Sequence, residues 1–234
     1  NALNGQIKGS LGVVPVLSST LFGAISGSGV ATASAIGGIT IPAMKKSGYP
    51  DEFATAISSI SSILGPIIPP SIPLIVYASV STVSVASLFI GSVLPGILLA
   101  CAIAVYCLIY GRKHDLPSYR KSSPIEILRA FKNGIWALLM PIIILGGIFG
   151  GIFTPTEAAA VSVAYALFVS GLIYKDLTWK DIPQVFVETS ISTATIMMLV
   201  GLSKASSYVV VTSGLPQQML EFSTSITSSK AVRS

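Results

Sequence analysis

The chain has 234 residues, of which 52% are hydrophobic and only 10% are charged, and its mean hydropathy is +0.80. A soluble globule of this size cannot cover so much apolar surface, so the composition excludes a water-soluble domain and indicates a membrane protein. The net charge is +5, but the basic residues lie in short segments beside apolar runs and lack interleaved aromatic residues. Positive-inside loops therefore explain this charge better than a nucleic-acid partner does.

The first two apolar stretches predict a helical hairpin. They cover residues 11–25 and 30–43, and a Gly/Ser segment at residues 26–29 joins them. At 1.5 Å per residue each arm is about 20 Å long, shorter than the roughly 30 Å hydrocarbon core. Lys8 precedes the first arm and Lys45 follows the second, so both outer ends are expected on the cytoplasmic side. This favours a re-entrant hairpin with its tip inside the membrane; two ordinary short helices joined by a flexible turn are the alternative.

The next apolar stretch, residues 53–80, reads as one transmembrane span that is interrupted in its middle. A helix from Phe53 reaches Leu64 and then meets residues 65–73. Four prolines within eight positions there remove four backbone donors and cannot continue an α-helix. The apolar run resumes at Leu74, so we predict a proline-broken transmembrane helix.

The rest of the chain predicts further spans. Residues 88–110 form a long span with a kink expected at Pro95, and a basic segment with a surface helix follows at residues 111–134. Two capping boxes mark helix starts, one beginning at Ser123 and one at Thr154. The remaining spans are predicted at residues 135–153, at 158–174 and within 185–211.

Two irregular elements, the tip at residues 26–29 and the break at residues 65–71, thus fall in one apolar region. Such backbone is tolerated at membrane depth only where it is buried in protein or lines a cavity, and its freed carbonyl groups suit a small hard cation such as sodium. The hydroxyls of Ser26, Ser28 and Ser71 are candidate additional ligands, and the amide ends of the half-helices can face an anionic substrate. The alternative is that glycine and proline here serve only close helix packing.

Longer runs resemble a known family. These runs are GAISGSGVATASAIGGITIPAMKKSGYPDEFATAISS, SSILGPIIPPSIPLIVY, SLFIGSVLPGILLA and GGIFGGIFTPTEAAAVSVAYAL. They resemble the large membrane subunit of tripartite ATP-independent periplasmic (TRAP) transporters, the DctM-like family, and follow the family's order. The resemblance extends from about residue 9 to residue 217, nearly the whole chain.

The resemblance implies an all-α, elevator-type permease with a partial inverted-repeat fold. It implies a sodium-coupled symporter that imports organic acids such as C4-dicarboxylates or sialic acid, lies in the cytoplasmic (inner) membrane of a bacterium or archaeon, and is no enzyme. The implied partners are a small four-helix membrane subunit and a periplasmic substrate-binding protein. No cofactor is implied besides the sodium coupling ion.

The resemblance also assigns domains and site residues. Residues 1–110 hold the first transport-domain repeat (hairpin 9–46, broken helix 53–80, span 88–110), residues 111–134 the basic cytoplasmic loop and surface helix, and residues 135–234 the following spans and the start of the second repeat. The sequence looks cut at both ends, and the second hairpin and second unwound segment of the family are missing. The implied substrate-binding residues are Ser26, Gly27, Ser28, Gly29 and Ser71. The implied sodium ligands are Ser26, Ser28, Gly65, Ile67, Pro69 and Ser71.

Other classes of function fit less well. An intramembrane enzyme with Ser26 or Ser28 as nucleophile needs a general base, and the membrane-depth candidate, Lys204, lies far along the chain with no motif around it. We interpret Lys204 as snorkelling to the interface rather than as functional. A pore favours polar or charged rings along its lining, and none is evident. A binding-protein-independent anion/sodium symporter and a non-transporting membrane scaffold stay open as alternatives.

Overall fold

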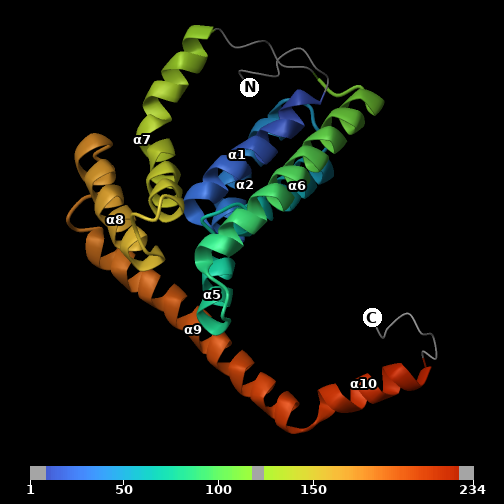
Figure 1. Cartoon of the computed structure of the whole chain (residues 1–234). Helices are drawn as coiled ribbons and strands as arrows, with labels where there is room; N and C mark the ends of the chain where they lie inside the picture. The colour runs from blue at the N-terminus through green and yellow to red at the C-terminus, as the bar shows by residue number, and fades with distance from the viewer. Residues whose placement is uncertain (1–8, 118–123, 227–234) are drawn as a thin grey trace. The chain divides into compact units, whose positions relative to one another are not determined.

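The computed structural model describes residues 9–117 and 124–226, and within these residues it contains helices and no strands. The all-α class predicted from the sequence is confirmed. Ser123, the first residue of one predicted capping box, lies outside the described residues. The elements, labelled in Figure 1, are α1 (Ser10–Ser26), α2 (Gly29–Lys46), α3 (Asp51–Ser61), α4 (Leu64–Ile67), α5 (Ile72–Val80), α6 (Val85–Lys113), α7 (Pro124–Phe149), α8 (Pro155–Phe168), the π-helical turn η1 (Val169–Ile173), α9 (Ile182–Thr212) and α10 (Leu215–Ile226).

Four helical segments in the described part of the chain are long and apolar enough to cross a membrane: α6, residues 128–149 of α7, α8 together with η1, and α9. The α3–α4 run and α5 together make a fifth candidate, bent by 41° at the break. Helix α1 has 17 residues, and neither α1 nor α2 qualifies as a span by itself. The chain is therefore a multi-pass membrane protein. The first hairpin arm is shorter than a span, as predicted, whereas α2, with 18 residues, is longer than the predicted second arm.

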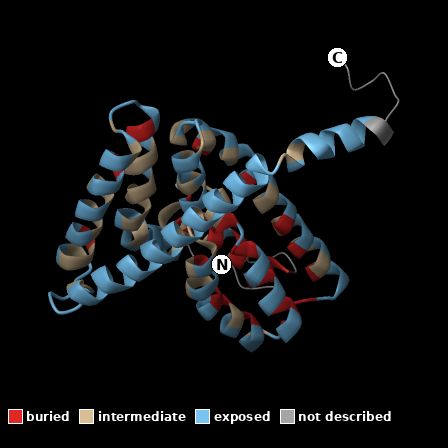
Figure 2. Ribbon diagram, turned by 90° about the horizontal axis from the view of Figure 1, so that it is seen from below, coloured by how far each residue is buried: buried red, intermediate tan, exposed pale blue. Residues whose placement is uncertain are grey.

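Contacts divide the chain into two units, one ending at Asp176 and one starting at Leu177. The main core of the first unit lies among α1, α3 and α6, where buried side chains such as Val16, Ile57 and Cys107 pack together. In the second unit, α9 has no buried residue. Figure 2 shows this contrast, with buried positions on helices of the first unit and pale blue, exposed positions along most of α9. An exposed helix with an 18-residue window of mean hydropathy 1.7 suits lipid surroundings.

The direction of the helices places the hairpin tip against the break. A Cβ at Gly12 of α1 would lie 3.3 Å from the Phe53 ring of α3, and a Cβ at Gly23 would lie 2.7 Å from the Cα of Gly65. Because both partners advance together along the chain, α1 runs parallel to the α3–α4 run. Helix α2 returns antiparallel to α3, with Thr40 Oγ1 3.1 Å from Ser58 Oγ. The loop between α1 and α2 therefore reaches the level at which α4 ends.

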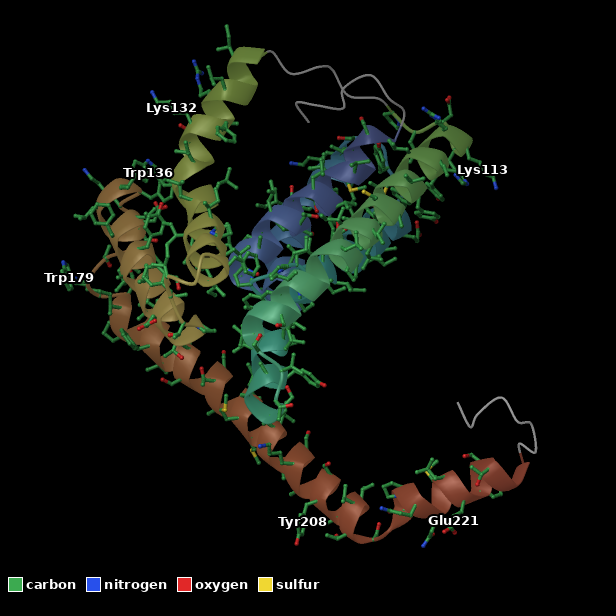
Figure 3. All side chains as sticks on the ribbon, viewed as in Figure 1. Lys113, Lys132, Trp136, Trp179, Tyr208 and Glu221 are labelled. Atoms are coloured by element: carbon green, nitrogen blue, oxygen red, sulfur yellow. The ribbon has the colours of Figure 1, made fainter. Side chains whose placement is uncertain are left out.

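Helices α7 and α8 form a second hairpin (Figure 1). Two tyrosine hydroxyls of α8 and its continuation donate to backbone carbonyls of α7, Tyr165 to Trp136 at 2.7 Å and Tyr174 to Asn133 at 2.8 Å. The predicted surface helix and the following span are one continuous helix, since the lone Gly134 between them does not stop a helix. In Figure 3, Lys132 projects from the first half of α7, and Lys113 marks the C-terminal end of α6.

Candidate functional site

The turn between α1 and α2 contains only two residues. Gly27 ends α1 in the left-handed conformation, with φ of 62°, and its amide donates to the carbonyl of Gly23 at 2.8 Å. Ser28 is extended and caps the start of α2, where its hydroxyl accepts from the amide of Ala31 at 3.3 Å. Glycine has no Cβ to oppose the left-handed conformation, which explains its place at this position.

Hydroxyl groups close the tip from the inside. Thr32 Oγ1 donates to the carbonyl of Ser28 at 2.7 Å and lies 3.4 Å from Ser26 Oγ. The amide of Ser28 in turn donates to Ser26 Oγ at 3.4 Å. Thr32 is fully buried, whereas Ser26 and Ser28 are half-buried. Sequence reasoning missed Thr32, although a hydroxyl residue one helical turn after a serine cap is a signal that points to it.

The prolines of the break leave some backbone carbonyl groups without their helical hydrogen-bond donor. Each proline lacks the amide that the carbonyl four residues earlier needs in a helix, which affects Ser62, Gly65, Pro66 and Pro69. Two of these carbonyls regain a partner: that of Ser62 accepts from the Gly65 amide at 3.0 Å, and that of Pro66 accepts from the Ser71 hydroxyl at 2.5 Å. The carbonyls of Gly65 and Pro69 accept no hydrogen bond from residues 9–117 or 124–226, and both residues are buried.

Ser71 links the break to the helix that follows. Its side chain is fully buried, and besides donating to Pro66 it accepts from the amide of Leu74 at 3.4 Å as the cap of α5. One hydroxyl thus satisfies a carbonyl before the turn and an amide after it.

The tip and the break are in direct contact. The amide of Ile72 donates to the carbonyl of Gly27 at 3.2 Å, and a Cβ at Gly27 would lie 2.7 Å from the carbonyl oxygen of Pro70. A Cβ at Gly65 would lie 2.6 Å from Thr32 Oγ1. The two segments, far apart in the sequence, therefore meet backbone to backbone, and glycine is required at both contact positions.

The other residues predicted for the site also lie here. Gly29 faces the Pro66 ring, with its would-be Cβ 3.4 Å from Pro66 Cδ. The side chain of Ile67 faces α6, where a Cβ at Gly96 would lie 3.3 Å from Ile67 Cγ2. Lys204 is exposed on α9, in the other unit. The structure thus brings the tip residues together with Gly65 and Ser71, whereas the side chain of Ile67 faces α6.

Four helix ends meet at this place. Helix α1 and the α3–α4 run end here, whereas α2 and α5 begin here, each with a serine cap. The carbonyl ends of helices carry partial negative charge and the amide ends partial positive charge. The atoms available to bind a ligand are neutral oxygen atoms of backbone carbonyl groups and of hydroxyl groups, and such oxygen ligands suit a hard cation. The amide ends of the helices suit an anion.

Comparisons with known proteins identify related sequences over nearly the whole chain. The model of the family described as tripartite ATP-independent periplasmic transporter, DctM component, matches residues 1–233. A C4-dicarboxylate TRAP transporter large permease protein of Pseudomonas aeruginosa is 39% identical over 226 residues, covering 97% of this chain and 53% of that protein.

Two further relatives carry other substrate names. A sialic acid TRAP transporter large permease protein of Vibrio cholerae is 38% identical over 221 residues, covering 94% of this chain and 52% of that protein. An ectoine TRAP transporter large permease protein of Halomonas elongata is 40% identical over 220 residues, covering 94% of this chain and 52% of that protein. The chain spans about half the length of the curated relatives it matches.

Proposed function

Because the chain belongs to the DctM family of tripartite ATP-independent periplasmic transporters, we propose that it forms one half of the transport site in a sodium-coupled large permease subunit. The family consists of transporter components rather than enzymes, in agreement with the prediction that this chain is no enzyme. The observation that carries the proposal concerns the buried residues Gly65 and Pro69 beside the hydroxyl-lined tip. Their carbonyl groups lack a hydrogen-bond donor among the residues that the structure describes.

The carbonyl pair supports a sodium site. A buried carbonyl without a partner costs about 1–3 kcal/mol, and a bound cation would offset that cost. A sodium ion takes neutral oxygen ligands and requires no carboxylate. We assign the ion to the carbonyl ends of α1 and the α3–α4 run, with the oxygen donors Gly65, Ile67, Pro69, Ser26, Ser28 and Ser71.

The opposite helix ends support an anionic substrate. The start of α2 at Gly29 and the start of α5 at Ile72 direct two positive helix ends toward the same place, which favours a carboxylate. We propose an organic acid of the C4-dicarboxylate or sialic-acid type, bound by the tip residues and Ser71. Relatives with three different substrate names are about equally similar to this chain, so the degree of identity does not choose among them.

The proposed assembly follows the family. A small four-helix membrane subunit accompanies the permease in the cytoplasmic membrane, and a periplasmic binding protein delivers the substrate. The chain covers about half of its relatives, and we propose that it contributes the first of two related halves.

Uptake into proteoliposomes tests this function. A complete permease that contains this chain is reconstituted with its small subunit, and uptake of labelled C4-dicarboxylates and of sialic acid is measured with the binding protein present. We expect uptake with an inward sodium gradient and little uptake when potassium or choline replaces sodium. Equal uptake without sodium would contradict the coupling. Uptake without the binding protein would favour the independent symporter, and failure to transport any organic acid would favour the scaffold.

A further inference from the structure

Thr32 occupies the contact between the tip and the break. Its side chain is fully buried, and its hydroxyl oxygen is the atom that a Cβ at Gly65 would approach to 2.6 Å. The same oxygen bonds the carbonyl of Ser28 at 2.7 Å and lies 3.4 Å from Ser26 Oγ. One atom therefore touches both segments of the candidate site.

The chemistry of these partners fixes the direction of each hydrogen bond. A carbonyl oxygen only accepts, so the single hydroxyl proton of Thr32 is committed to Ser28. The hydroxyl of Ser26 can then bond Thr32 only as the donor. The amide of Ser28 donates to Ser26 Oγ at 3.4 Å and closes the ring. The Ser26 hydroxyl thus donates its proton to Thr32 and accepts from the Ser28 amide with one lone pair. Its second lone pair stays available to bind a ligand.

We propose that Thr32 is a positioning residue for cation binding: it fixes the proton of the Ser26 hydroxyl so that Ser26 presents an oxygen lone pair to the site. This inference rests on the proposed sodium coupling and adds a residue through which the coupling is tuned. Thr32 also holds the Ser28 carbonyl and fills the space that Gly65 leaves open. Without the Thr32 hydroxyl, the Ser26 proton loses the acceptor that holds it away from the cation.

Thr40 provides a matched control on the same helix. It lies eight positions after Thr32, about 12 Å along the helix axis. Its hydroxyl is also buried, donates to the carbonyl of Ile36 at 2.7 Å and lies 3.1 Å from Ser58 Oγ. Thr40→Val therefore removes a buried hydroxyl with a comparable bond inventory, away from the tip.

The experiment uses the complete permease that contains this chain, with its partners, and compares Thr32→Val, Thr32→Ser and Thr40→Val. Two quantities are measured: the sodium concentration that gives half-maximal uptake, and the rise in melting temperature that sodium chloride causes relative to potassium chloride in detergent. We expect Thr32→Val to raise the half-saturating sodium concentration on the order of tenfold and to reduce the sodium-induced thermal shift. Thr32→Ser should stay close to the unmodified protein. Thr40→Val should lower the melting temperature without sodium yet keep the sodium dependence.

Equal sodium dependence in Thr32→Val and Thr40→Val would overturn the inference. If Thr32→Val does not reach the membrane, Ser26→Ala decides, because it removes the oxygen that Thr32 is proposed to orient. Ser26→Ala should raise the half-saturating sodium concentration as well, and an unchanged value would overturn the inference. Failure of the proposed function itself is recognised separately, since the unmodified permease would then show neither sodium-dependent uptake nor a sodium-induced thermal shift.

Discussion

The two helical hairpins of the first unit have similar turns and different surroundings. Both turns contain a glycine with positive φ, Gly27 at 62° and Gly151 at 67°, and both continue into a helix capped by a hydroxyl residue, Ser28 or Thr154. The α1–α2 turn is packed against a distant segment, with Gly27 buried. The α7–α8 turn is open, and its Ile152 is 71% exposed.

The α7–α8 turn satisfies its polar groups by itself. The amide and the hydroxyl of Thr154 both donate to Glu157 Oε2 at 2.8 Å, and the Glu157 amide donates to Thr154 Oγ1 at 3.3 Å. The α1–α2 turn instead accepts from Ile72 of the broken helix. The difference teaches that turn residues alone do not mark a site; the site forms where a turn and a second irregular segment complete each other.

The two glycines give the largest expected contrast. In Gly27→Ala the new Cβ meets the Pro70 carbonyl at 2.7 Å, whereas at Gly151 nothing lies within 4 Å. Left-handed strain costs about 1–2 kcal/mol at either position, and crowding adds about 1–3 kcal/mol at Gly27 alone. We expect Gly27→Ala to abolish uptake and Gly151→Ala to retain it, measured in proteoliposomes alongside unfolding in detergent. Equal losses in the two variants would remove the distinction between the turns.

Proline 69 tests whether the break itself is required. Pro69→Ala supplies an amide four residues after Gly65 and permits the α3–α4 run to continue, so the Gly65 carbonyl gains a donor. We expect loss of sodium-dependent uptake with normal insertion into the membrane. Pro42→Ala is the control, because Pro42 lies exposed within α2, thirteen positions after the tip residue Gly29. If Pro69→Ala takes up substrate at the normal rate and with unchanged sodium dependence, the assignment of residues 65–71 to the sodium site is wrong.

The helix caps Ser71 and Thr154 allow a second comparison of a buried with an exposed position. Ser71→Ala loses a buried cap and leaves the Pro66 carbonyl without its donor, for a combined cost of roughly 2–4 kcal/mol. Thr154→Ala removes an exposed cap and should cost about 1 kcal/mol. Chemical unfolding of the two variants in detergent measures the difference. A Thr154 variant less stable than the Ser71 variant would show that burial does not set the cost.

The smallest effect is expected at the outer end of the first hairpin. Lys45 and Asp51 form an ion pair at 2.9 Å with both side chains exposed. Lys45→Gln should lower the unfolding free energy by about 0.5 kcal/mol or less, and added salt should erase the difference. Unfolding at low and high ionic strength checks this. A larger, salt-resistant loss would mean that the outer end also holds the hairpin together.

Local pattern predicted the helices and their interruptions. The Gly/Ser tip and the four prolines are visible in the sequence because backbone chemistry decides them within a few residues. Helix α10 was missed, since its polar composition resembles a loop, although Pro216 suits a first helical turn. The approach of Thr32 to Gly65 and the contact between Gly23 and Gly65 could not be predicted. They depend on which faces of two parallel helices meet, and local spacing does not encode that pairing.

The chain order of the tip and the break has a consequence for synthesis. The tip at Gly27 leaves the ribosome before Ile72, the residue whose amide it accepts from. At about 5–20 residues per second, the intervening chain takes roughly 2–9 seconds to make. During that interval the polar groups of the tip have no partner in the break. The hairpin must therefore stay beside the translocation machinery or the aqueous surface until the broken helix that packs against the tip has been made.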